Sequence, residues 1–145
     1  MGGLPHMKDP LVNLCGYVLR RASLCALAEL NEGLAPLKLR HADVAMLMLV
    51  QSSPRITQSE AGRILDIKRA NMVPFVARLE ERGVIERQQL DGRSQALGLT
   101  RRGRMLLERA LRVVDAHEAL LLGRVPEKLR PVVLPVLLAL WRRRP

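Results

Sequence analysis

Residues 56–100 constrain the fold of this chain more than any other stretch, because several local signals follow one another there in a fixed order. Thr57 and Glu60 have the spacing of a capping box, in which each side chain accepts a hydrogen bond from the other residue's backbone N–H. This motif predicts a short helix that ends near Asp66. The spacing places Ala61, Ile64 and Leu65 on one face of this helix.

A second helix is predicted directly after this turn. Its buried stripe has helical spacing and comprises Met72, Phe75, Val76 and Leu79. The same spacing turns four residues outward: Arg69, Val73, Pro74 and Ala77. Gly83 is expected to end this helix in a left-handed conformation.

Two extended runs complete the stretch, Val84–Gln89 and Ser94–Leu99, joined at Asp91-Gly92. An Asp-Gly pair between two extended runs is a strong signal for a β-hairpin. Residues 55–57 could add a very short strand to that hairpin. Helix, turn, helix and hairpin in this order predict a winged helix-turn-helix.

These motifs also resemble those of the MarR family of bacterial regulators. The resemblance lies in LEERG at the end of a helix, in Asp-x-Arg within the wing, and in Leu-Thr-x-x-Gly opening the next helix, here Leu79–Gly83, Asp91–Arg93 and Leu99–Gly103. It is close between residues 41 and 107. It implies a mainly α fold with a small β-hairpin wing, and helices for dimerisation at both ends of the chain.

Charge and composition favour a polyanionic partner. The chain has 24 Lys+Arg against 14 Asp+Glu, a net charge of +10. Residues 55–104 hold eleven basic and six acidic residues, 11 − 6 = +5, half of that excess. A basic face kept only for solubility is the alternative, but the helix-turn-helix favours double-stranded DNA. The aromatic content of 2% argues against a protein that stacks bases of single strands.

Length and composition predict one cytoplasmic domain. The 145 residues can bury a core, and two cysteines are too few for a disulfide scaffold. No apolar run is long enough to span a membrane, and the first residues lack the apolar core of a secretion signal. Residues 1–6 have the appearance of a cloning scar, which would make Met7 the natural start.

The flanks of the helix-turn-helix are predicted to be helical and dimerising. Residues 7–38 would form an N-terminal dimerisation helix over Asp9–Glu32, with Pro10 in its first turn. A helix over Leu39–Gln51, with Val44, Met46, Leu47, Met48 and Leu49 buried, begins the DNA-binding region, residues 39–100. Residues 101–145 would hold two C-terminal dimerisation helices.

The first C-terminal helix is predicted over residues 101–122, capped by Thr100. The second is predicted from Pro126, and it carries more large apolar groups than a monomer's surface tolerates. These groups are Val132, Val136, Leu137, Leu140 and Trp141. Pro131 and Pro135 should interrupt its hydrogen bonds and kink it.

The start of the second helix of the motif supplies the predicted base contacts. In a helix-turn-helix this end of the helix enters the major groove, where arginine suits guanine and asparagine suits adenine. Lys68, Arg69 and Asn71 lie there, and Val73 and Pro74 could touch a thymine methyl group. Contacts to phosphate are an equally good interpretation of Lys68 and Arg69.

Further DNA contacts are predicted on the wing. Resemblance to the family implies that Arg93, at the hairpin tip, enters a narrow minor groove. Asp91 would orient Arg93, and the alternative is a solvated turn arginine. Arg87 and Ser94 complete the predicted contacts of the wing.

No motif points to catalysis, to a cofactor or to a metal. The chain lacks a nucleophile elbow and a glycine-rich phosphate loop, and its histidines at positions 6, 41 and 117 lack metal-ligand spacing. His41 is expected to cap a helix or to line a pocket.

Cys15 raises a second possibility for regulation, because Asn13-Leu14-Cys15 resembles the peroxide-sensing branch of the family. That branch holds its thiolate with tyrosines, whereas only Tyr17 is nearby here. Cysteines are usually buried, so a packed, inert Cys15 is the favoured interpretation, and Cys25 is expected in the core.

Residues 69–74 and 91–95 resemble a subgroup of repressors that respond to aromatic acids or their coenzyme A thioesters. The family's effector pocket lies between the first, second and fifth helices. Arg20, Arg21, His41 and Tyr17 are the candidates here for binding an anionic effector, although a solvated helix face explains them equally well. The preferred hypothesis is a homodimeric repressor released from a palindromic operator by an effector. Its rival is a dimer that coats DNA without sequence preference.

Overall fold

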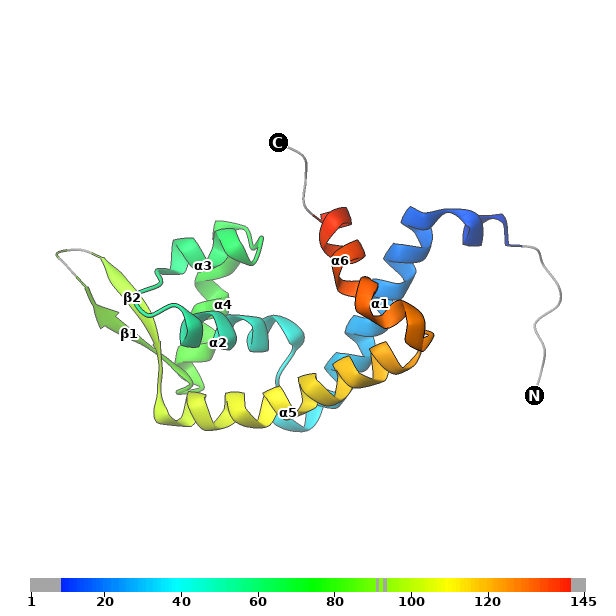
Figure 1. The fold of residues 1–145 in the computed structure, drawn as a ribbon. Coiled ribbons are helices and arrows are strands. Elements are labelled where there is room, and N and C mark those ends of the chain that lie inside the picture. Colours follow the sequence, from blue (N-terminus) through cyan, green and yellow to red (C-terminus); the bar gives the residue numbers. More distant parts are fainter. Residues whose placement is uncertain (1–8, 91, 93, 142–145) are drawn as a thin grey trace.

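The computed structural model describes residues 9–90, 92 and 94–141. The chain is mainly helical with one two-stranded antiparallel sheet, as predicted (Figure 1). Its helices are α1 (Cys15–Leu34), α2 (His41–Ser52), α3 (Gln58–Ile64), α4 (Arg69–Glu81), α5 (Arg101–Gly123) and α6 (Arg130–Trp141). The strands are β1 (Ile85–Gln89) and β2 (Gln95–Leu99).

The predicted helix-turn-helix is present as α3 and α4. The Thr57 hydroxyl accepts from the Glu60 N–H at 3.3 Å and the Glu60 carboxylate accepts from the Thr57 N–H at 2.8 Å, so the capping box is confirmed. Gly83 has a φ of 65°, the left-handed conformation expected after α4. Ile64, on the apolar face of α3, is 61% exposed. The buried residues of this seven-residue helix are Ala61 and Gly62.

The helix-turn-helix shares one core with α2, the wing and the first half of α5. The largest fully buried side chains include Met46, Leu47, Met72, Val76, Leu79, Val84, Leu97 and Leu107. The expectation that Met48 is buried is wrong, since it is 44% exposed. Helix α2 therefore retains one exposed apolar edge.

The wing is an antiparallel hairpin in which Ile85 pairs with Leu99 and Gln89 with Gln95. The predicted third strand is reduced to a single bridge between Thr57 and Ala96, beside a hydrogen bond from the Leu97 N–H to the Ile56 carbonyl. This bridge attaches the wing to the start of α3. Asp91 and Arg93 lie outside the described residues.

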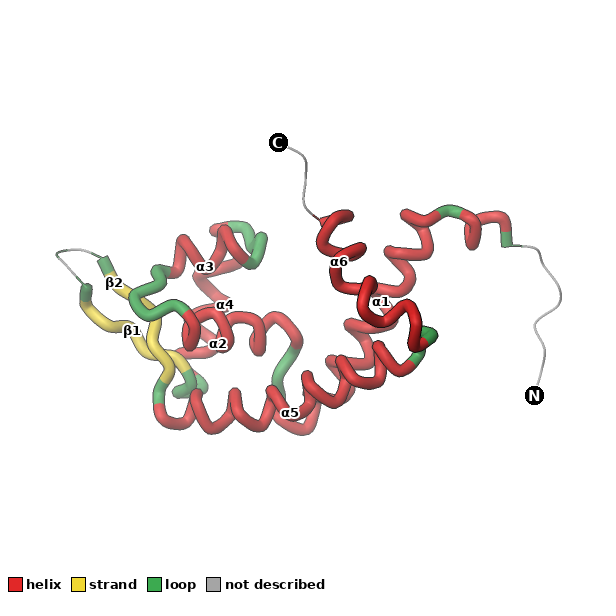
Figure 2. Tube along the Cα trace, in the orientation of Figure 1, coloured by secondary structure: helices red, strands yellow, loops and turns green. Residues whose placement is uncertain are grey.

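Helix α5 connects the DNA-binding region to the opposite end of the molecule. It begins beside the wing and extends to α1, which packs against its second half (Figures 1 and 2). The Thr100 hydroxyl accepts from the Gly103 N–H at 2.9 Å, which confirms the predicted cap. Helices α1 and α6 both lie at the end of the molecule away from the wing (Figure 1).

The flanking helices begin later than predicted. Pro10–Asn13 form a 3-10 turn, and the extended backbone of Leu14 separates this turn from α1. Helix α6 begins at Arg130 rather than near Pro126. Pro131 therefore lies in its first turn, where a missing N–H costs nothing, and only Pro135 lies inside the helix. A kink at Pro135 remains a prediction.

Helices α1 and α6 leave most of their apolar surface uncovered. Only Leu34 is buried in the twenty residues of α1, and α6 has no buried residue. Cys15 and Cys25 are both exposed, so the expectation that they are packed is wrong for the single chain. The cause is that α1 contacts its own chain mainly through its C-terminal half. No helix in the described part of the chain is long and apolar enough to cross a membrane.

Candidate nucleic-acid interface

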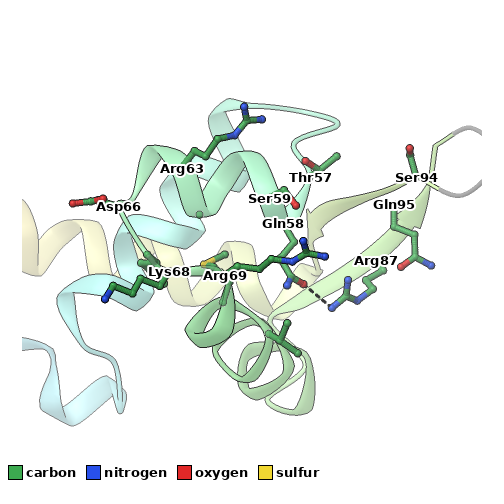
Figure 3. Close-up of a pocket in the computed structure, with 14 residues that line it drawn as sticks. Thr57, Gln58, Ser59, Arg63, Asp66, Lys68, Arg69, Arg87, Ser94 and Gln95 are labelled. Atoms are coloured by element: carbon green, nitrogen blue, oxygen red, sulfur yellow. Dashed lines mark hydrogen bonds between the residues drawn. The ribbon is translucent and has the colours of Figure 1, made fainter.

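A hollow of about 860 Å³ lies between α3, the start of α4 and the wing. Polar and cationic side chains from all three elements line it (Figure 3). Lys68 precedes α4 as its N-cap residue, and Arg69 is its first residue. Both are exposed, and neither has an ion-pair partner among the residues that the structure describes. These two cations are therefore available to an anionic partner.

Among the residues predicted to read bases, Arg69 has the best position, because it lines the hollow at the start of α4. Its side chain extends from the start of α4 toward the wing, on the side of Gln58 and Arg87 (Figure 3). Val73 lies one turn further along α4, lines the same hollow and is 55% exposed. Asn71 and Pro74 are also exposed on α4 but do not line the hollow. Pro74 lies inside α4 and has no N–H to donate, so the carbonyl of Ala70 lacks that helical hydrogen bond.

Arg87 differs from the other predicted contact residues because its guanidinium already forms hydrogen bonds within the chain. Its Nε donates to the Glu80 carboxylate at 2.9 Å, and its Nη2 donates to the Gln58 side chain at 3.1 Å. It therefore ties the wing to α3 and α4. Ser94 lines the hollow at the tip end of the wing, just before β2, whereas Asp91 and Arg93 lie outside the described residues.

Sequence reasoning did not assign to the site six polar residues that line this surface: Thr57, Gln58, Ser59, Arg63, Asp66 and Gln95. Gln58 and Ser59 directly follow the N-cap Thr57, so the capping box was the signal that could have found them. The first N–H groups of a helix favour anions. Hydrogen bonds from the backbone N–H and then the hydroxyl of Thr57 lower the pKa of Glu60, so this carboxylate stays charged at neutral pH beside the N-terminus of α3.

Two arginines near the C-terminal end of α4 hold this helix in place. The Arg78 guanidinium donates to the carboxylate of Asp43, a residue of α2 that is only 1% exposed. Arg82 donates to the carbonyl oxygens of Lys38 at 2.6 Å and Leu37 at 3.3 Å. The orientation of α4 therefore depends on α2 and on the segment that connects α1 to α2.

Replacing Arg78 with methionine should lower the free energy of unfolding by about 2–3 kcal/mol. The reason is that the buried Asp43 carboxylate would keep only the Arg40 N–H, at 2.8 Å, as a partner. Arg69→Met on the same helix is the matched control, expected to change stability by less than about 0.5 kcal/mol. Urea unfolding at equal protein concentration measures both, and equal losses would contradict this role of Arg78.

The predicted effector residues do not form one site within a single chain. Arg20 and Arg21 are exposed on the first half of α1, and Tyr17 is half-buried one turn before them. His41 is the first residue of α2, and its backbone N–H and Nδ1 both lie within hydrogen-bond distance of the Asn31 Oδ1, at 2.8 and 3.2 Å. His41 is not the cap of α2, because Arg40 and Asp43 form that cap. Eleven residues of helix, about 16 Å, separate Arg20 from Asn31.

Comparison with known proteins supports the interpretation of this geometry. A sequence profile of the MarR family matches residues 39–94. The HTH-type transcriptional repressor Rv2887 of Mycobacterium tuberculosis is 32% identical over 112 residues, covering 76% of this chain and 81% of the repressor. The chain belongs to the MarR family.

Solved structures of MarR-family proteins have the same fold. The transcriptional repressor CouR bound to a 23-mer DNA duplex superposes with a TM-score of 0.88 at 33% identity, covering 97% of this chain and 100% of CouR. CouR bound to p-coumaroyl-CoA gives 0.86 at 32% identity, with 96% and 99% covered. Rv2887 in complex with salicylic acid gives 0.70 at 32% identity, with 87% and 95% covered.

Proposed function

We propose that this MarR-family chain is a transcriptional repressor that binds a palindromic DNA operator as a homodimer and releases it when a small anionic effector binds. The observation that carries the proposal is the hollow between α3, α4 and the wing, with Lys68 and Arg69 at its edge and no ion-pair partner for either among the residues described. Relatives that superpose along the whole chain support it, because CouR was solved with DNA and is described as a repressor.

The proposed DNA contacts divide into three groups by chemistry. Arg69 and Asn71 contact guanine and adenine edges in the major groove, and Val73 and Pro74 contact thymine methyl groups. Lys68 and Ser94 contact phosphates and set the register of the protein on the duplex. Arg93 enters the minor groove with Asp91 orienting it, while Arg87 holds the wing through Glu80.

Dimerisation is proposed through α1 and α6. Their uncovered apolar side chains include Val18, Leu19, Leu24, Val136, Leu140 and Trp141, and Trp141 is 76% exposed. Such a surface is typical of an interface. Two recognition helices at one spacing would then read half-sites about 34–36 Å apart on one face of the DNA.

The fixed spacing of the two recognition helices allows an effector to control DNA binding. A ligand beside the interface can release DNA without touching it, provided that it binds the DNA-incompetent arrangement better. A tenfold preference at each of two sites gives about a hundredfold loss of DNA affinity. Relatives support an aromatic acid or its thioester as effector, since CouR binds p-coumaroyl-CoA and Rv2887 binds salicylic acid.

Operator binding tests the proposal. Selection from random duplexes should give a palindrome bound roughly 10³-fold or more tightly than unrelated DNA at the same salt concentration. Arg69→Ala should weaken operator binding by about 1–3 kcal/mol and weaken binding to unrelated DNA less. Arg93→Ala should behave in the same way if it reads groove width.

Arg109→Ala is the charge-matched control, because Arg109 is exposed on α5, which lies on the other side of the domain from α3 (Figure 1). Its effect should be small on both kinds of DNA. Equal losses of affinity for operator and for unrelated DNA would mean that Arg69 contacts only phosphate. A chain that shows no preferred sequence would be a DNA-coating protein instead.

A further inference from the structure

Gln58, the first residue of α3, is bonded to the wing across the hollow. Its side-chain oxygen accepts a hydrogen bond from the Arg87 Nη2 at 3.1 Å (Figure 3). The same guanidinium contacts both oxygens of the Glu80 carboxylate, from Nε at 2.9 Å and from Nη2 at 3.2 Å. Glu80 of α4 and Arg87 of β1 therefore form a chain of hydrogen bonds that ends on Gln58 of α3.

This chain fixes the orientation of the Gln58 amide. An arginine has only donors, so the amide atom that faces Arg87 is the carbonyl oxygen. Turning the amide over would place its NH2 group against the guanidinium, donor against donor, and would lose the hydrogen bond. The two bonds from Arg87 to Glu80 hold the guanidinium in one geometry, because a planar fork fits a carboxylate. The NH2 group of Gln58 therefore faces away from Arg87.

The NH2 group of Gln58 has no acceptor among the residues that the structure describes, although Gln58 lines the hollow. Glu60 of α3 accepts from Thr57, and Glu80 of α4 accepts from Arg87. A free glutamine side chain can pair with adenine because it donates and accepts together. The Gln58 oxygen is already occupied, so this side chain offers a partner in the hollow only donors.

We infer that Gln58 contacts a DNA phosphate, and that Arg87 and Glu80 are positioning residues that keep its NH2 group turned toward the DNA. Phosphate oxygens only accept hydrogen bonds, which matches a group that only donates, whereas base edges present both kinds of group. In a helix-turn-helix the first helix crosses the phosphate backbone, and Gln58 lies on that helix. This inference rests on the proposed DNA binding and adds to it one contact and the residues that orient it.

The first test is DNA binding by Gln58→Leu, which removes the donor. Affinity should fall roughly tenfold or more, by similar factors on operator and on unrelated DNA, because a phosphate contact does not read sequence. The dependence of affinity on salt should stay unchanged, since a neutral amide displaces no counterion. Lys68→Met should instead reduce the slope of log affinity against log salt by about 0.9 for each lysine removed.

Gln88→Leu is the matched control on the wing. Gln88 follows Arg87 along β1, so its side chain faces the other side of the hairpin, and its Nε2 already donates to the Glu86 carboxylate at 3.3 Å. This variant should change the affinity for either DNA by less than about twofold.

Gln58→Glu separates the DNA contact from the bond to Arg87. A carboxylate accepts from Arg87 at least as well as the amide does, but it cannot donate to a phosphate and repels it. This variant should therefore bind DNA more weakly than Gln58→Leu. Affinity within about twofold of the wild type would overturn the inference, because Gln58 would then serve only to anchor the wing.

Duplexes that carry one neutral methylphosphonate in each half-site locate the contact. At one position the wild type should lose roughly fivefold or more in affinity beyond the loss of Gln58→Leu, for which that contact is already absent. Arg87→Met should reduce the effect at this position and keep the effect at the phosphate of Lys68. Equal reductions at both would overturn the positioning role of Arg87.

Two further results would overturn the phosphate contact. One is the same loss in wild type and in Gln58→Leu at every methylphosphonate position, and the other is a loss in Gln58→Leu that is confined to the operator. Failure of the proposed function has a different signature. A chain without a preferred operator would not be a specific repressor, whereas the effect of Gln58→Leu can still be measured on unrelated DNA.

Discussion

Gly103→Ala should lower the free energy of unfolding by about 3 kcal/mol or more, enough to abolish folding of a marginal domain. A β-carbon at Gly103 would lie 2.0 Å from the carbonyl oxygen of Val84 and 2.9 Å from its carbonyl carbon. Neither group moves easily, because the same Val84 carbonyl accepts from the Thr100 N–H at 3.2 Å. The Thr100 hydroxyl also donates to the Gly83 carbonyl at 2.7 Å.

The matched control is Gly123→Ala, the same substitution at the other end of the same helix. A β-carbon at Gly123 would meet nothing within 4 Å, and its φ is not positive. Alanine there should stabilise the chain by roughly 0.5–1 kcal/mol, because it reduces the conformational freedom of the unfolded state. Denaturant unfolding at equal protein concentration compares the two. A loss of less than about 1 kcal/mol at Gly103 would mean that α5 shifts away from the wing more freely than its hydrogen bonds suggest.

Removing residues 126–145 should convert the proposed dimer into a monomer and weaken operator binding at least about a hundredfold, because one recognition helix would replace two linked ones. The residues lost include α6, of which every large apolar side chain is exposed or half-buried in the single chain. Sedimentation gives the oligomeric state, and operator titration gives the affinity.

Point variants separate this effect from misfolding. Leu137→Glu places a charge on α6 at a side chain that is 44% exposed, and it should favour the monomer while leaving the helical content unchanged. Met105→Glu is the control, because Met105 is 58% exposed on α5 at the wing end, outside the proposed interface. A truncated chain that sediments as a stable, folded dimer would contradict the assignment of α6.

The sequence by itself determined the elements whose signals are short in range. The Thr57–Glu60 capping box, the left-handed Gly83 and the Thr100 cap are each encoded within a few residues, and all three are present. Apolar periodicity placed α4 and α5 in the same way. It failed for Met48, because periodicity gives the direction of a side chain but not the element that covers it.

Only the tertiary structure decided which distant residues meet. Arg78 and Asp43 are 35 residues apart, and Arg124 and Glu29 are 95 apart, so no local pattern pairs them. Gly103 was visible as part of a motif, but its requirement for glycine comes from the Val84 carbonyl that packs against it. The sequence places His117 on one face of a helix, but only the packing of α1 against α5 shows that it is buried beside an apolar hollow. The physical reason is that backbone hydrogen bonds and caps act within one turn, whereas packing and ion pairing depend on how whole helices cross.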